Sequence, residues 1–283
     1  MPKVSVIIPT HNRPELLKRA INSVLAQTYQ DFEIIVVDDG DISAEDIVKS
    51  FSDSRIRFIR HETPHRGGSA TRNTGIKNAT GEFIAFLDDD DEWLPEKLEV
   101  QMQEFENTPE DVGFCFSSVI NDFGGGKEQT TSVPEGVHDF YELALRRFKG
   151  FLTVTLIIKK KTLFNTGLFD ENLPSHQDPD LIIRLARKYK GLGINKPLVR
   201  VSIAEEREHI GGDLAKRIKG REMILSKYMD EFKKRPSTLA YHYFQLGLWY
   251  RDIGQKNKAR EYFKKALAAK FNLRYLWHYF ANI

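Results

Sequence analysis

The chain has 283 residues, of which 41% are hydrophobic and 29% are charged. These proportions fit a globular protein with one large domain, or a large and a small one, and they exclude collagen-like and disordered chains. The longest apolar runs, such as residues 151–158, are too short to span a bilayer, and no secretory signal pattern precedes residue 4, so we expect a cytoplasmic protein. The single cysteine, Cys115, is expected to be a small buried residue.

Charge is distributed unevenly along the chain. The formal net charge is +2, but residues 233–283 contain eleven Lys or Arg and only two acids, a net charge of +9. The remaining residues, 1–232, therefore carry a net charge of −7. This asymmetry predicts two regions with different roles, 1–232 and 233–283.

Strand and helix signals alternate over the first ninety residues. Continuous apolar runs predict strands at residues 4–9, 32–37, 55–60 and 82–87. Helical periodicity predicts helices at residues 15–28 and 44–51, and a third that opens at Ser69. Short apolar strands separated by helices predict an α/β fold with a mostly parallel sheet that helices cover on both faces.

Strand signals are sparser in the second half. The glycine-rich segment 121–136 is expected to be a mobile loop, and residues 151–158 and 199–203 are expected to be strands. A helix is expected just after Asp178-Pro179-Asp180, and the polar segment 205–213, which contains His209, is expected to be a loop. From Leu214 onward the pattern is helical, with a break at Pro236.

The basic C-terminal region has a repeat signal of its own. Leu246-Gly247, Ala259, Phe263 and Ala266 match the spacing of a tetratricopeptide repeat, although the proline that ends that pattern is missing. This spacing predicts two antiparallel helices, a small all-α region that follows the α/β fold. One repeat cannot bury its own apolar face, so it has to pack on the preceding domain, on residues 275–283 or on a partner.

Two acidic clusters follow predicted strands. Asp38-Asp39 comes after one strand and Asp88-Asp89-Asp90-Asp91 after another, and the carboxyl ends of parallel strands meet at one edge of a sheet, where ligands bind. Either these residues cap turns and helices, or their oxygens hold Mg²⁺ or Mn²⁺ together with a substrate's phosphates. Since no His or Cys adjoins the longer run in sequence, zinc is disfavoured there.

Three other segments have the chemistry of binding or catalysis. Thr10-His11-Asn12-Arg13 and residues 66–73, which include Arg72, each lead from a loop into a helix with cations that suit phosphate, although Asn12 could instead cap the first helix. Asp39 either contacts a base or ribose, or caps the turn at Gly40. Asp178 is either a helix cap or a general base.

Six motifs, in this order, resemble the family-2 glycosyltransferases with the GT-A fold. They are VSVIIPTHNR (4–13), AQTYQDFE (26–33), VVDDG (36–40), ATRNTG (70–75), GEFIAFLDDDD (81–91) and GLFDEN (167–172). The resemblance covers roughly residues 3–205. It implies a Rossmann-like GT-A domain that binds a nucleotide sugar.

The resemblance also implies roles for individual residues. Asp90 takes the place of the metal ligand of the D-x-D motif, and Asp88 and Asp89 lie in that motif against the donor. Asp178 is implied as the catalytic base, in a pair whose Glu is replaced by Gln177. The remaining implied donor-binding residues are Pro9, Thr10, His11, Asn12, Arg13, Asp39 and Arg72.

The implied reaction is a metal-dependent, inverting transfer of a hexose from a nucleoside-diphosphate sugar, with UDP as the family's common nucleotide. The acceptor is a hydroxyl of a glycan, a lipid-linked molecule or another compound, and Mn²⁺ or Mg²⁺ is the cofactor. Two alternatives stay open, a scaffold that binds sugar nucleotides without transferring the sugar, and a nucleotidyltransferase. The basic C-terminal helices are expected to contact the acidic domain, an anionic membrane at its inner face, or another protein, and no nucleic acid is expected.

Overall fold

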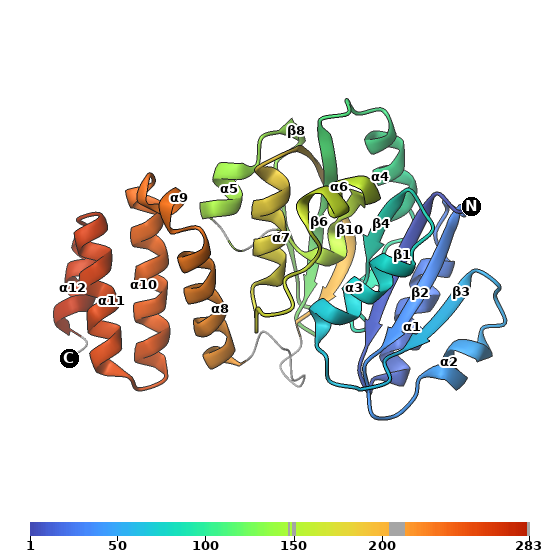
Figure 1. The fold of residues 1–283 in the computed structure, drawn as a ribbon, viewed down its shortest axis with the longest axis horizontal. Helices are drawn as coiled ribbons and strands as arrows, with labels where there is room; N and C mark the ends of the chain where they lie inside the picture. Colours follow the sequence, from blue (N-terminus) through green and yellow to red (C-terminus); the bar gives the residue numbers. More distant parts are fainter. Residues whose placement is uncertain (147, 149–150, 204–212, 282–283) are drawn as a thin grey trace. The chain divides into compact units, whose positions relative to one another are not determined.

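The computed structural model describes residues 1–146, 148, 151–203 and 213–281 (Figure 1). The chain divides into two units, one formed by Met1–Glu171 with Leu181–Glu206 and the other by Asn172–Asp180 with Arg207–Ile283. The expected loop around His209 lies outside the described residues. The predicted domain boundary at 232/233 falls within helix α9 (Met229–Lys233) and stays a prediction.

The first unit is built on one large sheet with the order β3-β2-β1-β4-β9-β6-β10-β5, in which β7 pairs with β6 and β8 pairs with β10. Its strands are β1 (Val4–Thr10), β2 (Phe32–Asp38), β3 (Ile56–Arg60), β4 (Phe83–Phe86), β5 (Glu92–Trp93), β6 (Val112–Asp122), β7 (Glu128–Thr131), β8 (Gly136–His138), β9 (Ile157–Lys159) and β10 (Lys190–Ser202). The first four run parallel, and β6 runs parallel to β10. The prediction of a mostly parallel sheet is confirmed.

Helices cover both faces of the sheet because its strands are apolar on both sides. They are α1 (Pro14–Leu25), α2 (Glu45–Ser50), α3 (Gly68–Asn78), α4 (Lys97–Glu106), α5 (Tyr141–Arg146), α6 (Lys160–Thr166) and α7 (Gln177–Ala186). Val6 and Ile8 of β1 lie in one buried cluster with α1 and α4. Ile7 points the other way, against α3, where a Cβ added to Gly75 would lie 2.4 Å from the Ile7 side chain. This close approach requires glycine at position 75.

The parallel register places several motifs at one edge of the sheet. Thr10 pairs with Asp38 at the ends of β1 and β2, and Ile7 pairs with Phe86 at the end of β4. The segments that follow these strands therefore meet at the carboxyl edge, as predicted for the two acidic clusters.

The second unit contains only helices among its described residues, in addition to the short segment that precedes α7. They are α8 (Leu214–Lys227), α9, α10 (Pro236–Asp252), α11 (Lys256–Ala269) and α12 (Leu273–Ala281). Helices α10 and α11 pack side by side, with Gly247 of α10 against the ring of Phe263 (Figure 1). The predicted helical pair is present, and Pro236 begins α10, which fits the predicted break.

Some predicted elements differ from the structure. The segment predicted as a mobile loop forms a hairpin, in which β7 pairs with the end of β6 across a turn with three glycines at positive φ, Gly124, Gly125 and Gly126. The strand expected at 151–158 is a short 3₁₀ helix (Thr153–Thr155) followed by β9. The strand expected at 199–203 is the end of the much longer β10.

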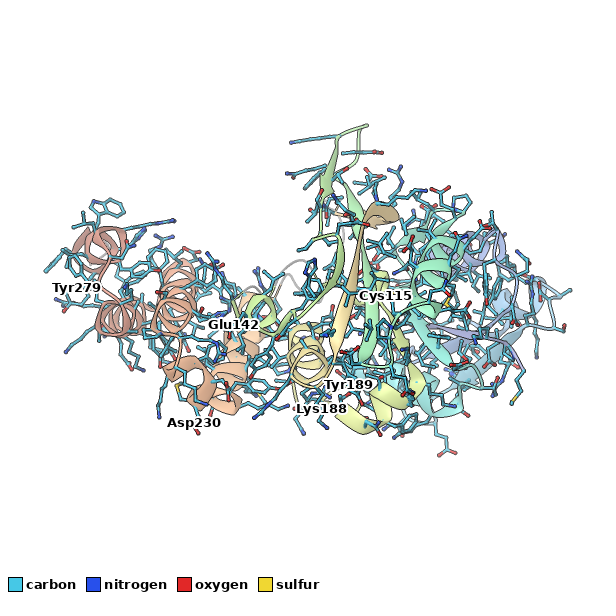
Figure 2. The ribbon with its side chains drawn as sticks, turned by 90° about the horizontal axis from the view of Figure 1, so that it is seen from above. Cys115, Glu142, Lys188, Tyr189, Asp230 and Tyr279 are labelled. Carbon is cyan, nitrogen blue, oxygen red and sulfur yellow. The ribbon has the colours of Figure 1, made fainter. Side chains whose placement is uncertain are left out.

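Cys115 is fully buried on β6, as expected (Figure 2). Within the part of the chain that the structure describes, no helix has the length and apolar character needed to cross a membrane.

Candidate active site

The acidic run after β4 is held by cationic side chains from two neighbouring segments. Arg13, which precedes α1, places its guanidinium 2.9 Å from Asp90 Oδ2 and 3.3 Å from Asp89 Oδ1. Arg72 of α3 pairs with Asp88. The structure thus brings together four implied donor residues, Arg13, Arg72, Asp88 and Asp89, and the implied metal ligand Asp90.

Thr10 extends this arrangement into the sheet. Its hydroxyl donates to Asp89 Oδ2 at 2.9 Å, so the last residue of β1 is tied to the loop after β4. Burial raises the pKa of Asp89 to about 6, and the charges of Asp90 and Asp88 add to this rise, while Thr10 and Arg13 oppose it. Negative charge at this edge is therefore only partly offset by the protein itself.

Asp91 does not have the helix-capping role that was one of the two alternatives for the aspartate run. It does not cap the following helix, which begins at Lys97 after Glu96. Instead, the backbone N–H of Ser202, at the end of β10, donates to Asp91 Oδ1 at 3.1 Å. The Asp91 side chain is buried, and burial, together with Asp88 and Asp90, raises its pKa well above the ordinary value.

The residues of this edge fit a divalent cation of the Mg²⁺ or Mn²⁺ kind. Their donor atoms are carboxylate oxygens, which such cations prefer. The carboxylates of Asp88, Asp89 and Asp90 each have a partner in Arg72, Thr10 or Arg13, so they do not form a closed protein cage. That arrangement suits an ion that one or two carboxylates and a substrate's phosphates would share.

The carboxylates of Asp38 and Asp39 have different structural roles. The carboxylate of Asp38 accepts from the N–H groups of Gly40 and Ala44, so the turn-capping role considered for Asp39 belongs to Asp38. Gly40 is required here because an added Cβ would lie 2.6 Å from Asn12 Oδ1 and 2.9 Å from Asn12 N.

The carboxylate of Asp39 anchors the loop after β3. It accepts from Arg66 N at 3.0 Å and Gly67 N at 2.8 Å, and lies 2.7 Å from His61 Nδ1. Burial would raise the pKa of Asp39, but the hydrogen bonds from His61, Gly67 and Arg66 outweigh it and lower the pKa. Three of the four acceptor positions of this ionised carboxylate are thereby used within the protein.

The segment after β1 does not cap α1 through Asn12. Arg13 holds the cap position, without a side-chain cap, and Pro14 opens the helix. Asn12 has a positive φ of 56° and directs its amide to the loop after β2, where it accepts from Ile42 N at 3.1 Å. Pro9 lies half-buried in β1, paired with Val37, and His11 is exposed beside it.

Arg72 is positioned by the GLFDEN segment. Asn73 donates to the carbonyl oxygen of Phe169 at 2.9 Å and accepts from its N–H at 2.9 Å. The Phe169 ring packs edge-on against Phe86 and lies 5.7 Å from the Arg72 guanidinium. Two motifs far apart in sequence therefore hold one cation at the acidic edge.

Asp178 belongs to the second unit. It lies half-buried in the first turn of α7, one residue inside the helix rather than at the cap position. Two hydrogen bonds fix this segment within the unit. Ser175 donates to the carbonyl oxygen of Lys216 in α8 at 3.0 Å, and Asp180 accepts from the hydroxyl of Tyr228, which directly follows α8, at 2.7 Å. The helix start therefore has a defined position within its unit.

Several residues of these sites have no distinguishing signal in the sequence. His61 and His65 come from the loop after β3, and Arg19 of α1 donates to Asp90 O at 2.7 Å. No motif distinguishes them, since a histidine in a loop or an arginine on a helix is common at any surface. Only the preference of a buried carboxylate such as Asp39 for a nearby donor could have indicated His61.

The sheet order and the acidic edge define a glycosyltransferase of the GT-A class. Residues 5–172 match the family described as "Glycosyl transferase family 2". The chain therefore belongs to glycosyl transferase family 2.

Relatives agree with this family. The chain is 38% identical over 210 residues to an uncharacterized glycosyltransferase of Rickettsia felis, an alignment that spans 71% of this chain but only 33% of that protein. It is 39% identical over 197 residues to an uncharacterized glycosyltransferase of Methanocaldococcus jannaschii, with 67% of each covered. A GalNAc(5)-diNAcBac-PP-undecaprenol beta-1,3-glucosyltransferase of Campylobacter jejuni is 44% identical over 108 residues, 36% of this chain and 34% of that protein.

Solved structures share the fold. Residues 1–349 of TarS from S. aureus give a TM-score of 0.70 at 20% identity, covering 94% of this chain and 80% of that one, and the same protein has been solved with UDP-GlcNAc. A mannosyltransferase of Pyrobaculum calidifontis, in complex with GDP-Man and Mn²⁺, gives 0.63 at 20% identity over 97% of this chain and 77% of that one.

Proposed function

We propose that this chain is a metal-dependent, inverting glycosyltransferase that moves a sugar from a nucleoside-diphosphate sugar, UDP being the preferred nucleotide, to a hydroxyl of a lipid-linked glycan. The observation that carries the proposal is the carboxyl edge of the sheet, where Arg13 and Arg72 lie against Asp88, Asp89 and Asp90. Guanidinium groups bind a diphosphate, and carboxylates bind the divalent ion that accompanies it. The relatives support a lipid-linked acceptor, since the Campylobacter protein is named for an undecaprenol-linked substrate.

The donor is expected to bind along this edge. Asp90 would hold the metal ion, with Asp88 and Asp89 beside the ribose and phosphates, and Asp39 would contact the base through its remaining acceptor position. Arg13 and Arg72 would exchange part of their pairing with the acidic run for contacts to the donor's phosphates. The rest of the donor site would be lined by Pro9, Thr10, His11 and Asn12.

The sugar would be transferred by direct displacement of the nucleoside diphosphate. A bound Mg²⁺ or Mn²⁺ would supply Lewis-acid stabilisation of the charge on the departing nucleoside diphosphate. Arg13 and Arg72 would add fixed positive charge to the same group. Asp178 would accept the proton of the acceptor hydroxyl as that oxygen attacks the anomeric carbon from the face opposite the leaving group.

The basic C-terminal helices suit an anionic membrane surface, where a lipid-linked acceptor is found. Helix α12 packs inward through Tyr275 and His278, whose rings lie 4.6 and 5.0 Å from that of Phe244. Its outer face exposes Leu273, Trp277 and Phe280 by 62–73%, at the i, i+4, i+7 spacing of one helical stripe. An exposed stripe with tryptophan on a strongly basic region is typical of an interfacial helix.

A panel of nucleotide sugars tests the proposal. Each is added to the full chain with Mn²⁺ or Mg²⁺, and thermal unfolding and release of the nucleoside diphosphate are measured. We expect one sugar nucleotide to raise the unfolding temperature in a metal-dependent way and to be hydrolysed slowly without an acceptor. Stabilisation without any release would favour the sugar-nucleotide-binding scaffold, and release of pyrophosphate from a nucleoside triphosphate and a sugar phosphate would favour a nucleotidyltransferase.

A further inference from the structure

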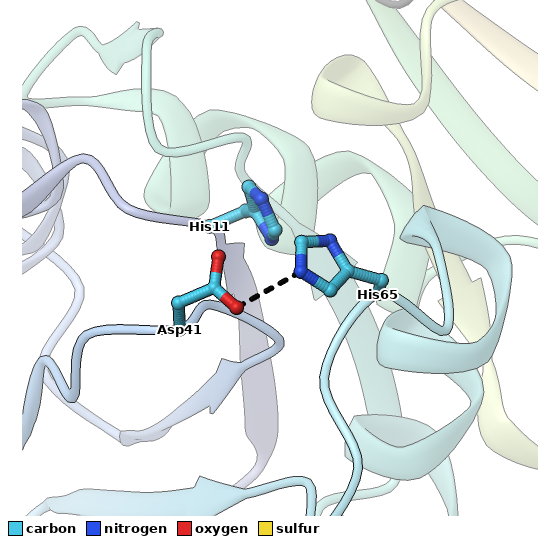
Figure 3. A group of neighbouring side chains, drawn as sticks. All are labelled: His11, Asp41 and His65. Carbon is cyan, nitrogen blue, oxygen red and sulfur yellow. Dashed lines mark hydrogen bonds and ion pairs between the residues drawn. The ribbon is translucent and has the colours of Figure 1, made fainter.

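Three exposed side chains from three different loops meet beside the carboxyl edge of the sheet (Figure 3). His11 follows β1, Asp41 follows β2 and His65 follows β3. One ligand atom of each side chain lies within 4.8 Å of the ligand atoms of the other two. Residues that far apart in sequence converge here only because the three parallel strands end together.

His11 is oriented by its backbone surroundings. Its Nδ1 lies 2.8 Å from the carbonyl oxygen of Asp39, which can only accept, so Nδ1 carries the proton. In the neutral imidazole the lone pair is then on Nε2. A histidine that donates one ring N–H to a backbone carbonyl and offers the other nitrogen outward has the usual arrangement of a metal ligand.

The position of the Asn12 amide indicates that lone pairs of His11 Nε2 and of Asp41 Oδ2 point toward the same place. Its amide nitrogen lies 3.1 Å from Asp41 Oδ2 and 3.4 Å from His11 Nε2, so one donor group faces an oxygen of Asp41 and the unprotonated ring nitrogen of His11. The other oxygen of Asp41 lies 3.0 Å from His65 Nε2.

The backbone of two of these loops is held in an uncommon conformation. Asn12 and His65 have φ values of 56° and 64°, in the left-handed region that non-glycine residues rarely adopt. The rings of His11 and His65 approach edge to face, with centroids 4.9 Å apart, although both side chains are exposed.

We propose that His11, Asp41 and His65 form a binding site for a divalent cation of the zinc class, with two imidazole nitrogens and one carboxylate oxygen as protein ligands. Two nitrogens and one oxygen are the ligands of open, three-residue zinc sites, and imidazole favours Zn²⁺, Ni²⁺ and Cu²⁺ over Mg²⁺. The site uses none of the oxygen ligands of the acidic edge, Asp88–Asp90, although it shares His11 with the proposed donor site. It would bind its ion without a nucleotide, so it does not depend on the proposed function.

A bound ion would connect the loops that follow β1, β2 and β3. It would replace the proton that His65 shares with Asp41, and the three loops would no longer move independently. Since the ion binds the folded chain and not these distant residues when unfolded, it should also raise the unfolding temperature.

Direct titration tests the site. The full chain, free of any polyhistidine tag, is titrated with Zn²⁺ against a chromophoric chelator, with excess Mg²⁺ present to occupy oxygen sites. We expect one equivalent of Zn²⁺ to bind, and His65→Ala and Asp41→Asn to weaken this binding by about tenfold or more. Substitution with Co²⁺ should give the intense visible absorption of a four-coordinate site, and His65→Ala should remove it.

Two controls make the outcome specific. His138→Ala removes an exposed histidine elsewhere, and Asp90→Asn removes the proposed oxygen ligand, and neither should change the affinity for Zn²⁺. Circular dichroism confirms that each variant is folded. Zinc binding that is unchanged in His65→Ala and Asp41→Asn, or that disappears in excess Mg²⁺, would overturn the proposal.

Discussion

Glu33, an acidic residue of the AQTYQDFE motif, has a structural task at the amino end of the sheet. Its Oε1 accepts from Ser5 Oγ, from Thr80 N and from Thr80 Oγ1 at 2.6–2.7 Å, and its Oε2 accepts from Arg57 at 2.8 Å. Burial would raise the pKa of Glu33, but these hydrogen bonds outweigh it and lower the pKa to about 2. The side chain thus links β1, β2, β3 and the loop before β4.

The lowered pKa predicts a specific loss of stability in acid. Below the ordinary value of 4.5 the unfolded chain binds a proton that folded Glu33 rejects, so its contribution is complete above pH 4.5 and is lost as the pH falls toward 2. At neutral pH this contribution is about 3 kcal/mol. Urea unfolding at pH 6 and pH 3 should show that Glu33→Gln is less stable at pH 6 and loses roughly 2 kcal/mol less between the two values. An equal loss in both proteins would contradict this.

Asp178 is the residue on which the proposed chemistry depends. Asp178→Asn keeps the shape of the side chain but removes its capacity to accept a proton at neutral pH. We expect the transfer rate to fall about a hundredfold or more, while binding of the sugar nucleotide stays within about twofold. Single-turnover transfer and calorimetric titration of the donor separate the two effects. Unchanged transfer would remove Asp178 from the role of base.

At the scale of elements, helix α8 holds the segment that precedes Asp178. A Cβ on Gly220 would lie 2.3 Å from Ser175 Oγ, 2.7 Å from the Ser175 carbonyl oxygen and 3.1 Å from His176 Nδ1. The backbone carbonyl cannot rotate away, so a larger residue has to displace the segment. Gly220 is therefore a positioning residue for the start of α7.

Gly220→Ala should lower transfer by about tenfold to a hundredfold without weakening donor binding, because a small displacement of a catalytic group is costly. Gly247→Ala is the matched control, since its Cβ would lie 2.5 Å from the Phe263 ring in the α10–α11 pair. That variant should lose about 1–3 kcal/mol of stability with little change in transfer below its unfolding temperature. Equal effects of the two variants on transfer would show that Gly220 has no special role.

Elements were predictable where their apolar residues are contiguous. Strands β1 and β2 are continuous apolar runs, and α1 has a clear stripe, so their ends were predicted within a few residues. Strand β7 could not be predicted, because all four of its residues are exposed and polar and only pairing with β6 makes it a strand. Most of β10 was missed because it contains Gly191, Gly193 and Pro197. Gly193 is required there, since an added Cβ would lie 1.8 Å from Pro134 O.

The residues of the candidate site also differ in whether the sequence alone identifies them. The four consecutive aspartates were found because charge at the end of a buried strand is conspicuous along the chain, and the family pattern then distinguished Asp90. The structural roles of Asp38 and Asp91 were not predictable, because their partners Ala44 and Ser202 are fixed only by the loops and by the end of β10. His61 and His65 depend in the same way on how β3 pairs with β2.

At the scale of the whole molecule, the basic C-terminal region is expected to hold the protein at an anionic membrane. Replacing Trp277 and Phe280 by Ser should reduce retention on anionic vesicles severalfold, because both side chains are 62% exposed on α12. Phe164→Ser, which removes a 52% exposed aromatic residue of the first unit, should leave retention unchanged. Vesicle flotation at low and high salt measures this, and retention of the double variant equal to that of the parent chain would argue against the membrane contact.

The carboxyl edge of the sheet is proposed to bind a nucleoside diphosphate together with a divalent cation held by Asp90. Calorimetric titration of UDP into the full chain, with Mn²⁺ and then with a chelator, measures this binding. We predict binding that requires Mn²⁺ and that Asp90→Asn weakens by about tenfold or more, while the folded structure is retained. Affinity for UDP that is the same with and without the metal ion, and the same in Asp90→Asn, would rule out a metal ion held by Asp90.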